Sequence, residues 1–521
     1  MKSEHGSTNQ HASQAKDLPV THRLRVTGSL WERLRAHHLA QGKHTEAISL
    51  ALGHVHHNFD GTLTIVLSSH DGLMLFADDC YERRSFGAAV LRREVRAQVM
   101  WRAVQEGWTA VVDIHDHHFA QRAAFSSVDD RDDRATASYF AETLPAHTQR
   151  PPVAAALLLA QQDAVARFVG GDPSIGWGAP MRVDVVGSHG LNAPGLASPE
   201  TQEASRVSLH ARHACILPPA AQWRLAGLRV AVAGCGGTGS IAAEALARLG
   251  IGHLSLIDSD RIEMHNLNRL QGCGVADVGR YKTEVLAERL FALMPDVRVD
   301  AVCCTVHEGI GREHLAAADV VIGCVDNAET RWWLNRAAVQ HLQPYFDAGV
   351  LVEAAKDPRF VHRINIIIPG AGPCGECSPI DYFPRQRPAA FLDGQTLRVQ
   401  REAGYLEGVA STDGGGDPSL YGLNLQAVGT LMQEFTTWAA GRPVAHSVAQ
   451  VAAEGLSQRL RLQDFGGAPA SDCPLCSTLL GAAESAPLPV ANESGIDGIC
   501  QEAGSSVQAA LRATFGELAD D

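Results

Sequence analysis

The sequence lacks any apolar run of the roughly 18 residues that a membrane-spanning helix needs. Its first 17 residues, MKSEHGSTNQHASQAKD, are polar and lack the hydrophobic core of a secretion signal. Basic residues are also fewer than acidic ones. The chain has 44 Lys and Arg and 58 Asp and Glu, which gives a formal net charge of −14. We therefore expect a cytoplasmic protein whose partner is neither a membrane nor a nucleic acid.

The spacing of the 12 cysteines also does not indicate a set of disulfide bonds. Most are embedded in apolar segments, as Cys303, Cys304 and Cys324 are, and we expect them to be reduced, small hydrophobic side chains. The exceptions form two Cys-x-x-Cys pairs, Cys374/Cys377 in GPCGECS and Cys473/Cys476 in SDCPLCS. Four such thiolates predict one tetrahedral structural Zn²⁺ site, whereas a redox role suits a single pair better than two.

The chain of 521 residues exceeds a single domain of ordinary size, so we expect two or three domains. Pro, Gly, Ser and Ala dominate residues 188–206, which predicts a linker. The expected organisation is a disordered tail at 1–17, a first domain at 18–187, the linker at 188–206, a second domain at 207–480, and a C-terminal tail with a short helix at 481–521.

The second domain is organised around the stretch from Leu228 to Arg331. An apolar run is followed by a glycine cluster, a helical pattern and a second apolar run that ends at Asp258. The clustered glycines are Gly234, Gly236, Gly237 and Gly239. Glycines permit a tight strand-to-helix turn and let backbone N–H groups approach a phosphate, so the pattern predicts a nucleotide-binding βαβ unit. By itself this pattern fits NAD, FAD or ATP.

The polar residues that follow favour a triphosphate. They are Asp260, Asn266, Arg269, Lys282 and Asp326. Cations beside a glycine loop suit phosphates, and an aspartate at the end of a later strand suits Mg²⁺. Strands and helices continue to alternate beyond Asp326, which predicts a doubly wound sheet with its ligand at the carboxyl ends of the strands. An ordinary NAD site stays as the alternative.

The segment DSDRIEMHNLNRLQ resembles the D-x-D…N-L-x-R-Q pattern of the ThiF-like, ubiquitin-activating superfamily, and the likeness runs from about Leu209 to Leu479. The resemblance implies a Rossmann-like α/β fold and ATP-dependent adenylation of the C-terminal glycine of a ubiquitin-like or sulfur-carrier protein. It also implies roles for single residues: Asp258 for ribose, Asn266, Arg269 and Lys282 for phosphates, and Asp326 for magnesium. HARHACILP resembles the family stretch whose arginine, here Arg212, reaches a triphosphate, often across a homodimer.

The first domain reads as a smaller α/β domain with a mixed set of strands. Strands are expected at HRLRVT, EAISLALGHVHH, TLTIVLSS, TAVVDIHDHHF, PPVAAALLLAQ and MRVDVVG. Helices are expected at SLWERLRAHHLAQ and over the whole of Arg84–Glu106.

Most candidate metal-binding and catalytic residues of the first domain lie in the segment IHDHHFAQRAAFSSVD. Alternation along an extended segment puts His115 and His117 on one side, and Asp129 follows. Two imidazoles and a carboxylate can hold a catalytic Zn²⁺ with a fourth position for water. The pattern resembles the JAMM/MPN metalloprotease signature, which implies that Glu46 in EAISLALGH is the general acid/base and that Ser126 helps to hold the oxyanion.

This stretch departs from the JAMM pattern in two ways. The spacer from His117 to Ser126 is one residue longer, and His118 stands where a proline is usual. His118 could therefore replace His117 as a ligand, or Ser127 could replace Ser126. A solvated, His-rich loop in an inactive domain is the further alternative.

Together these features predict a bifunctional enzyme that cleaves ubiquitin-like precursors or conjugates and adenylates the exposed glycine. The alternatives are a sulfur-carrier activator for molybdopterin or thiamine synthesis, and a binding scaffold whose JAMM-like domain is inactive. No cysteine lies between Cys377 and Cys473, where related enzymes carry the thioester cysteine. Either the reaction stops at the acyl-adenylate, or a cysteine such as Cys500 forms the thioester and passes the product to a conjugating enzyme.

Overall fold

The computed structural model describes residues 22–40, 44–68, 71–142, 152–187, 190–192, 211–213, 215–353, 359–377, 419–444, 447–454, 457–464, 473, 475–476 and 478–483. The predicted disorder of residues 1–17 and the thioester candidate Cys500 lie outside these residues. So does the helix expected near the C-terminus.

The first domain is built on a nine-stranded mixed sheet with the order β1-β3-β2-β7-β8-β9-β10-β11, and β4 pairs with β2. A further pairing between β1 and β10 closes the sheet on itself. Its strands are β1 (His22–Thr27), β2 (Ile48–His57), β3 (Leu63–Leu67), β4 (Leu73–Leu75), β7 (Ala110–Asp116), β8 (Val153–Leu159), β9 (Ala164–Gly170), β10 (Pro180–Gly187) and β11 (Gly190–Asn192). Its helices are α1 (Gly28–His38), α2 (Arg93–Gln105) and α3 (Ser127–Glu142). The predicted strands and the first predicted helix are confirmed.

The helix predicted over Arg84–Glu106 is wrong in its first part. Only α2 is helical, and the preceding residues form the hairpin β5 (Tyr81–Ser85) and β6 (Ala88–Leu91). Tyr81 and Leu91 are buried, and the Tyr81 hydroxyl hydrogen-bonds Ile48 of β2 at 3.0 Å. These tertiary contacts override the helical preference of the alanines in β6.

The second domain contains an eight-stranded sheet with the order β14-β13-β12-β15-β16-β17-β18-β19. The pairs from β14 to β16 are parallel and the pairs beyond β16 are antiparallel. Its strands are β12 (Arg229–Ala233), β13 (His253–Ile257), β14 (Arg298–Val302), β15 (Val320–Gly323), β16 (Tyr345–Glu353), β17 (Arg359–Ile367), β18 (Ser447–Glu454) and β19 (Ser457–Asp464). This is the doubly wound arrangement that the sequence predicts, with antiparallel strands added at one edge.

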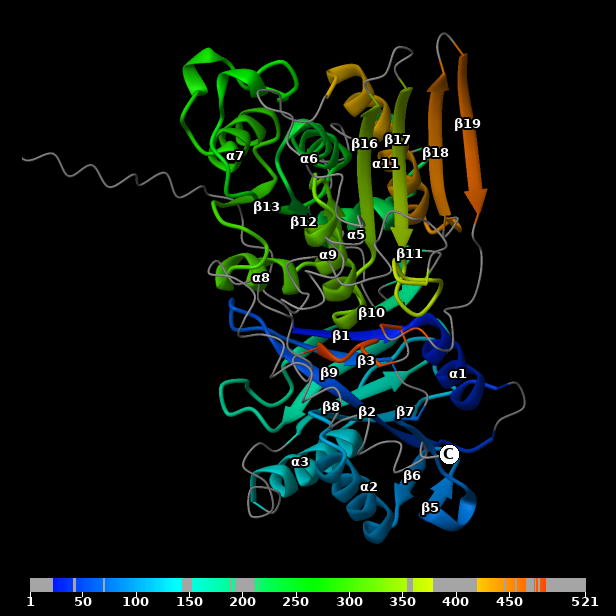
Figure 1. The fold of residues 1–521 in the computed structure, drawn as a ribbon. Coiled ribbons are helices and arrows are strands. Elements are labelled where there is room, and N and C mark those ends of the chain that lie inside the picture. Colours follow the sequence, from blue (N-terminus) through cyan, green and yellow to red (C-terminus); the bar gives the residue numbers. More distant parts are fainter. Residues whose placement is uncertain are drawn as a thin grey trace, which may run out of the picture.

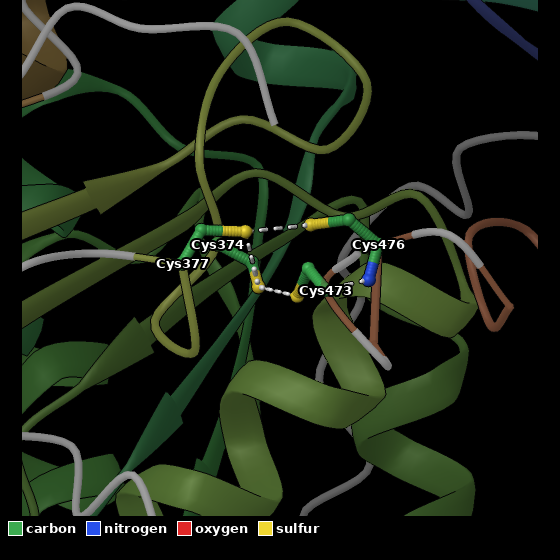
Figure 2. Close-up of side chains that lie close together, drawn as sticks. All are labelled: Cys374, Cys377, Cys473 and Cys476. Atoms are coloured by element: carbon green, nitrogen blue, oxygen red, sulfur yellow. Dashed lines mark hydrogen bonds between the residues drawn. The ribbon is translucent and has the colours of Figure 1, made fainter. Parts of the chain in front are cut away.

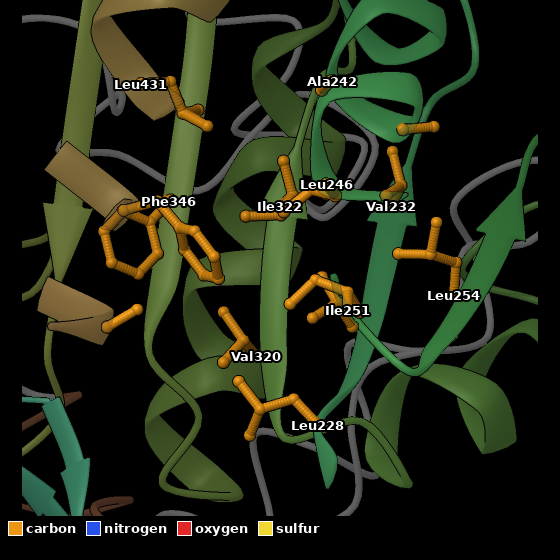
Figure 3. Packing of buried hydrophobic residues seen from close by; sticks show 14 of the residues in the cluster. Leu228, Val232, Ala242, Leu246, Ile251, Leu254, Val320, Ile322, Phe346 and Leu431 are labelled. Carbon is orange, nitrogen blue, oxygen red and sulfur yellow. The ribbon is translucent and has the colours of Figure 1, made fainter. Parts of the chain in front are cut away.

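Helices cover both faces of this sheet (Figure 1). They are α5 (Pro219–Gly227), α6 (Gly237–Leu249), α7 (Lys282–Leu293), α8 (Gly309–Ala316), α9 (Ala328–Gln340) and α11 (Tyr421–Ala439). One apolar core joins the sheet to α6, α7 and α11, and Figure 3 shows Leu246, Ile322 and Leu431 within it. A second core on the opposite face includes Trp332 and Trp333 of α9.

The two domains meet through a buried ionic cluster. Asp319, immediately before β15, is fully buried and accepts Arg25 at 3.1 Å and Arg182 at 2.6 Å from the first domain. Arg23 Nε lies 3.0 Å from the same carboxylate. The first domain therefore contacts the amino edge of the second sheet, opposite the edge where a nucleotide is expected.

The segment predicted as a linker contains β11, which extends the first sheet. Beside it, Trp438 of α11 donates a hydrogen bond from Nε1 to the Gly187 carbonyl at 3.1 Å. Residues 188–189 and 193–206 of that segment lie outside the described residues. Across the described parts of the chain, every helix is too short or too polar to cross a bilayer.

Candidate functional site

The glycine loop after β12 leaves no room for side chains at two positions. Gly234 has φ +85°, and a Cβ there would lie 2.7 Å from the Cys324 carbonyl oxygen. A Cβ on Gly239 would lie 1.8 Å from the Gly234 carbonyl oxygen. Gly236 caps α6, which starts at Gly237, so the first N–H groups of α6 open onto the carboxyl edge of the sheet. A helix N-terminus in this position suits an anion.

Asp258 ties the next strand to this loop. Its Oδ2 accepts the Cys235 backbone N–H at 2.6 Å, and its Oδ1 accepts the Asp260 N–H at 2.8 Å. Burial raises the pKa of Asp258, and the nearby Lys282 only partly offsets this. The carboxylate therefore stands at the edge of the loop, where a ribose is expected.

Lys282, the first residue of α7, supplies the cation of this edge. Its Nζ pairs with Asp260 Oδ2 at 2.7 Å. Burial alone would lower the pKa of Lys282, but the carboxylates of Asp258 and Asp260 outweigh it and raise the pKa. The ammonium group is therefore charged where a phosphate could exchange for one of its carboxylate partners.

Arg269 and Asn266 come from the segment between β13 and α7. The alkyl part of Arg269 lies against Gly237, since its Cγ would be 3.2 Å from a Cβ at that position. Its Nη1 donates to the His265 carbonyl oxygen at 3.0 Å. Asn266 is buried, and its Oδ1 accepts the Glu263 N–H at 3.0 Å, so its side chain also caps a short 3-10 helix.

Asp326 is exposed just beyond the carboxyl end of β15, the strand that pairs with β12. Asn327 then caps α9 by accepting the Thr330 N–H at 2.7 Å. The structure thus gathers the glycine loop, Asp258, Asp260, Arg269, Lys282 and Asp326 at one edge of the sheet. Arg212 lies exposed in a 3-10 turn, and its guanidinium makes no ion pair within the described part of the chain.

Sequence reasoning missed Asn424, in the first turn of α11. It is 1% exposed, and its Nδ2 would lie 2.3 Å from a Cβ on Gly237. Its amide oxygen has no hydrogen-bond partner among the described residues. One helix turn earlier, the Tyr421 hydroxyl donates to Gln271 Oε1. A polar residue within the apolar stripe of α11 was the signal that could have identified this contact.

The four paired cysteines lie together beside α9 (Figure 2). Cys374 Sγ is 3.7 Å from both Cys377 Sγ and Cys473 Sγ, and Cys377 Sγ is 3.5 Å from Cys476 Sγ. All four are free cysteines in the structure. A tetrahedral Zn²⁺ with Zn–S bonds of about 2.3 Å needs sulfurs about 3.8 Å apart, so the residues fit the metal.

A second group in the first domain contains His115, His117 and Asp129. His115 Nε2 lies 3.2 Å from Asp129 Oδ1, and His117 Nε2 lies 3.6 Å from Asp129 Oδ2. Zn²⁺ ligands at about 2.1 Å in tetrahedral geometry are about 3.4 Å apart. One ligand atom from each of the three residues lies within 4.8 Å of the other two, so the three residues also fit the metal. Burial alone would raise the pKa of Asp129, but hydrogen bonds with His115 and Ser126 hold it well below its usual range.

The predicted neighbours of this group have distinct positions. Ser126 caps α3, because its Oγ accepts the Val128 and Asp129 N–H groups at 3.3 Å each. His118 lies in the turn after β7, and its Nδ1 is 3.0 Å from Asp116 Oδ2. The structure therefore groups His117, and not His118, with the other two candidate ligands.

Residues 210–464 match the ThiF family. The ubiquitin-like modifier-activating enzyme 5 of Bombyx mori is 36% identical over 163 residues, which cover 29% of this chain and 39% of that protein. The SAMP-activating enzyme E1 of Haloferax volcanii is 34% identical over 177 residues, which cover 34% of this chain and 63% of that protein. This chain therefore spans less than two thirds of each relative. The family match and these relatives support a ThiF-type, ATP-dependent adenylating domain.

Among solved structures, that of E. coli MccB with ATP is similar, with a TM-score of 0.40 and 20% identity. The similarity covers 53% of this chain and 76% of that chain.

Proposed function

We propose that this protein uses ATP and Mg²⁺ to adenylate the C-terminal glycine of a ubiquitin-like protein. The observation that carries the proposal is the position of Lys282, which pairs with Asp260 at 2.7 Å beside the glycine loop. An NAD site has no need of a partly buried cation among carboxylates at this edge. The ThiF match over residues 210–464 supports the same chemistry.

In the proposed reaction the glycine carboxylate attacks the α-phosphorus, a new O–P bond forms, and the bond to the pyrophosphate oxygen breaks. The N-terminus of α6, Arg269 and Lys282 hold the phosphates and stabilise the charge that develops on them. Asp258 binds the ribose, and Asn266 keeps the Arg269 segment in place. Magnesium, held by Asp326, would neutralise charge on the phosphate oxygens.

Binding of a non-hydrolysable ATP analogue with Mg²⁺, measured by isothermal titration calorimetry, tests the nucleotide site. Lys282→Ala and Asp326→Ala should each weaken binding at least tenfold. Arg280→Ala is the matched control, because this exposed neighbour pairs with Glu288 instead of facing the loop. Unchanged binding in both site variants would contradict the assignment.

We also propose that the first domain is a zinc hydrolase that cleaves ubiquitin-like precursors or conjugates. The observation that favours this second activity is the spacing of the His115, His117 and Asp129 ligand atoms. Zinc bound there would lower the pKa of its water toward neutrality. Glu46 would take the proton and pass it to the leaving amine, and Ser126 would help to hold the oxyanion.

Metal content and cleavage together test this second activity. Glu46→Gln should keep the metal and abolish cleavage of a ubiquitin-like fusion, whereas His117→Ala should lose both. His118→Ala is the matched control and should keep the metal. If His118→Ala strips the zinc and His117→Ala does not, the ligand assignment is wrong.

The remaining proposals concern the product, the partners and the oligomeric state. A thiocarboxylate product would identify a sulfur-carrier activator, whereas a protein conjugate would support a ubiquitin-like pathway with a conjugating enzyme. If neither site is active, the chain is a binding scaffold. We propose a homodimer in which Arg212 serves the partner's nucleotide, so a mixture of Arg212→Ala and Asp326→Ala proteins should regain activity.

A further inference from the structure

Asp116, the last residue of β7, belongs to a second set of polar residues, on the face of the strand opposite His115. Asp116 is fully buried, and its Oδ1 lies 2.8 Å from His38 Nδ1. His38 Nε2 in turn lies 2.6 Å from Ser49 Oγ. This network, which we call the Asp116 network, consists of Ser49, His38, Asp116 and His118 and joins α1, β2 and β7.

The Asp116 network reaches the segment that carries Glu46. Asp116 Oδ1 accepts the Ala47 backbone N–H at 3.0 Å. The antiparallel register of β2 and β7 pairs Ile48 with His115, so its continuation puts Ala47 opposite Asp116 and Glu46 opposite His117. Directly opposed residues have their side chains on the same face of a sheet. This extension of the register beyond Ile48, where β2 begins, would place Glu46 on the same face as the two candidate histidine ligands.

Two backbone contacts of Glu46 come from β5. Its N–H donates to the Ser85 carbonyl oxygen at 2.9 Å, and its carbonyl oxygen accepts Arg84 Nε at 2.9 Å. On the β7 side, a side chain and not a backbone group accepts the next N–H of this segment. The position of Glu46 relative to His117 therefore depends on the Asp116 carboxylate.

Burying a carboxylate costs free energy of desolvation, which several hydrogen-bond donors must offset. Its neighbours in β7, such as Val112 and Ile114, are buried and apolar. An apolar residue at position 116 would fill the same space but could not accept the Ala47 N–H. The carboxylate therefore contributes the position of the Ala47 backbone, and not the filling of space.

We propose that Asp116 is a positioning residue that holds Glu46 opposite His117 at the distance needed for proton transfer from zinc-bound water. The proposal rests on the proposed hydrolase activity of the first domain. His38 and Ser49 orient the carboxylate from behind, and His118 holds its other oxygen. The residue that breaks the JAMM pattern after His117 thus belongs to the Asp116 network.

Hydrogen exchange of the full-length protein, followed by mass spectrometry, tests the contact without any need for activity. Asp116→Ala should speed exchange in peptides covering Ala47 at least tenfold. Asp116→Asn, which keeps an oxygen acceptor, should have a smaller effect and serves if the alanine variant does not fold. Asp113→Asn, on the same strand but paired with Arg96, is the matched control and should leave exchange at Ala47 unchanged.

Turnover and zinc content complete the test, with ubiquitin carrying a fluorogenic amide at its C-terminal glycine as the probe. Asp116→Ala should lower kcat at least tenfold, change KM less than threefold and keep the zinc held by His115, His117 and Asp129. Wild-type exchange at Ala47, or loss of zinc in proportion to activity, would overturn the positioning role. Wild-type protein that binds zinc but cleaves nothing would instead count against the proposed hydrolase, while the exchange result still decides the contact.

Discussion

At the scale of a single residue, the shape of the glycine loop depends on Gly239. A Cβ there would meet the Gly234 carbonyl oxygen at 1.8 Å, which no side chain can accommodate without moving the loop. The glycine cluster was predictable, because a tight turn next to a helix N-terminus requires it. The roles of Asp116 and Asn424 could not be predicted, because their main partners are distant in sequence and no local spacing pattern indicates them.

Gly239→Ala should lower the free energy of unfolding by about 1–3 kcal/mol through overpacking. It should also abolish ATP binding. Gly227→Ala is the matched control, because a Cβ at that position meets nothing within 4 Å and Gly227 belongs to α5 and not to the loop. Thermal unfolding and calorimetric ATP binding measure both effects. Equal behaviour of the two variants would contradict the steric account.

At the scale of elements, the cysteine cluster fixes the chain beside α9. Cys374 and Cys473 are brought within 3.7 Å, and the Gly375 N–H donates to Asn335 of α9 at 2.9 Å. The two pairs were predictable because Cys-x-x-Cys spacing encodes ligand geometry locally. The β5–β6 hairpin was not, because its packing against β2 overrides the local helical pattern.

Replacing Cys374 and Cys377 with serine should remove one zinc per chain and lower the melting temperature, because binding energy at such a site is folding energy. Metal analysis alongside thermal unfolding checks this prediction. The zinc that we propose for the first domain should stay, so the double variant should then keep one of two metals. A variant that loses no metal, or a wild-type cluster that contains a disulfide, would show the zinc assignment to be wrong.

At the scale of the whole molecule, the buried ionic cluster makes the two domains depend on each other. Burial alone would raise the pKa of Asp319, but Arg182, Arg23 and Arg25 hold it well below its usual range. Burial also opposes ionisation of Asp60, yet hydrogen bonds from Thr62 and from Arg229 of the second domain lower its pKa to about 2. Contacts of this kind, between residues up to 296 positions apart, leave no periodic signal in a sequence.

Both carboxylates have lower pKa values in the folded protein than the value of about 3.9 expected when unfolded. Their contribution to stability is therefore complete above that value and is lost as the pH falls toward the folded pKa values. The melting temperature should fall steeply between about pH 4 and pH 2. Asp319→Asn should already be destabilised at pH 7 by about 3–5 kcal/mol, because it leaves buried arginines unpaired. A variant as stable as wild type at pH 7 would contradict the coupling.

The central claim is that the second domain activates a C-terminal glycine, and ATP–pyrophosphate exchange tests it most directly. Exchange should appear only when a small ubiquitin-like protein ending in glycine is added, and it should vanish when that glycine is removed or when Asp326 is replaced with alanine. Exchange that persists without the terminal glycine, or at the wild-type rate in Asp326→Ala, would contradict the account.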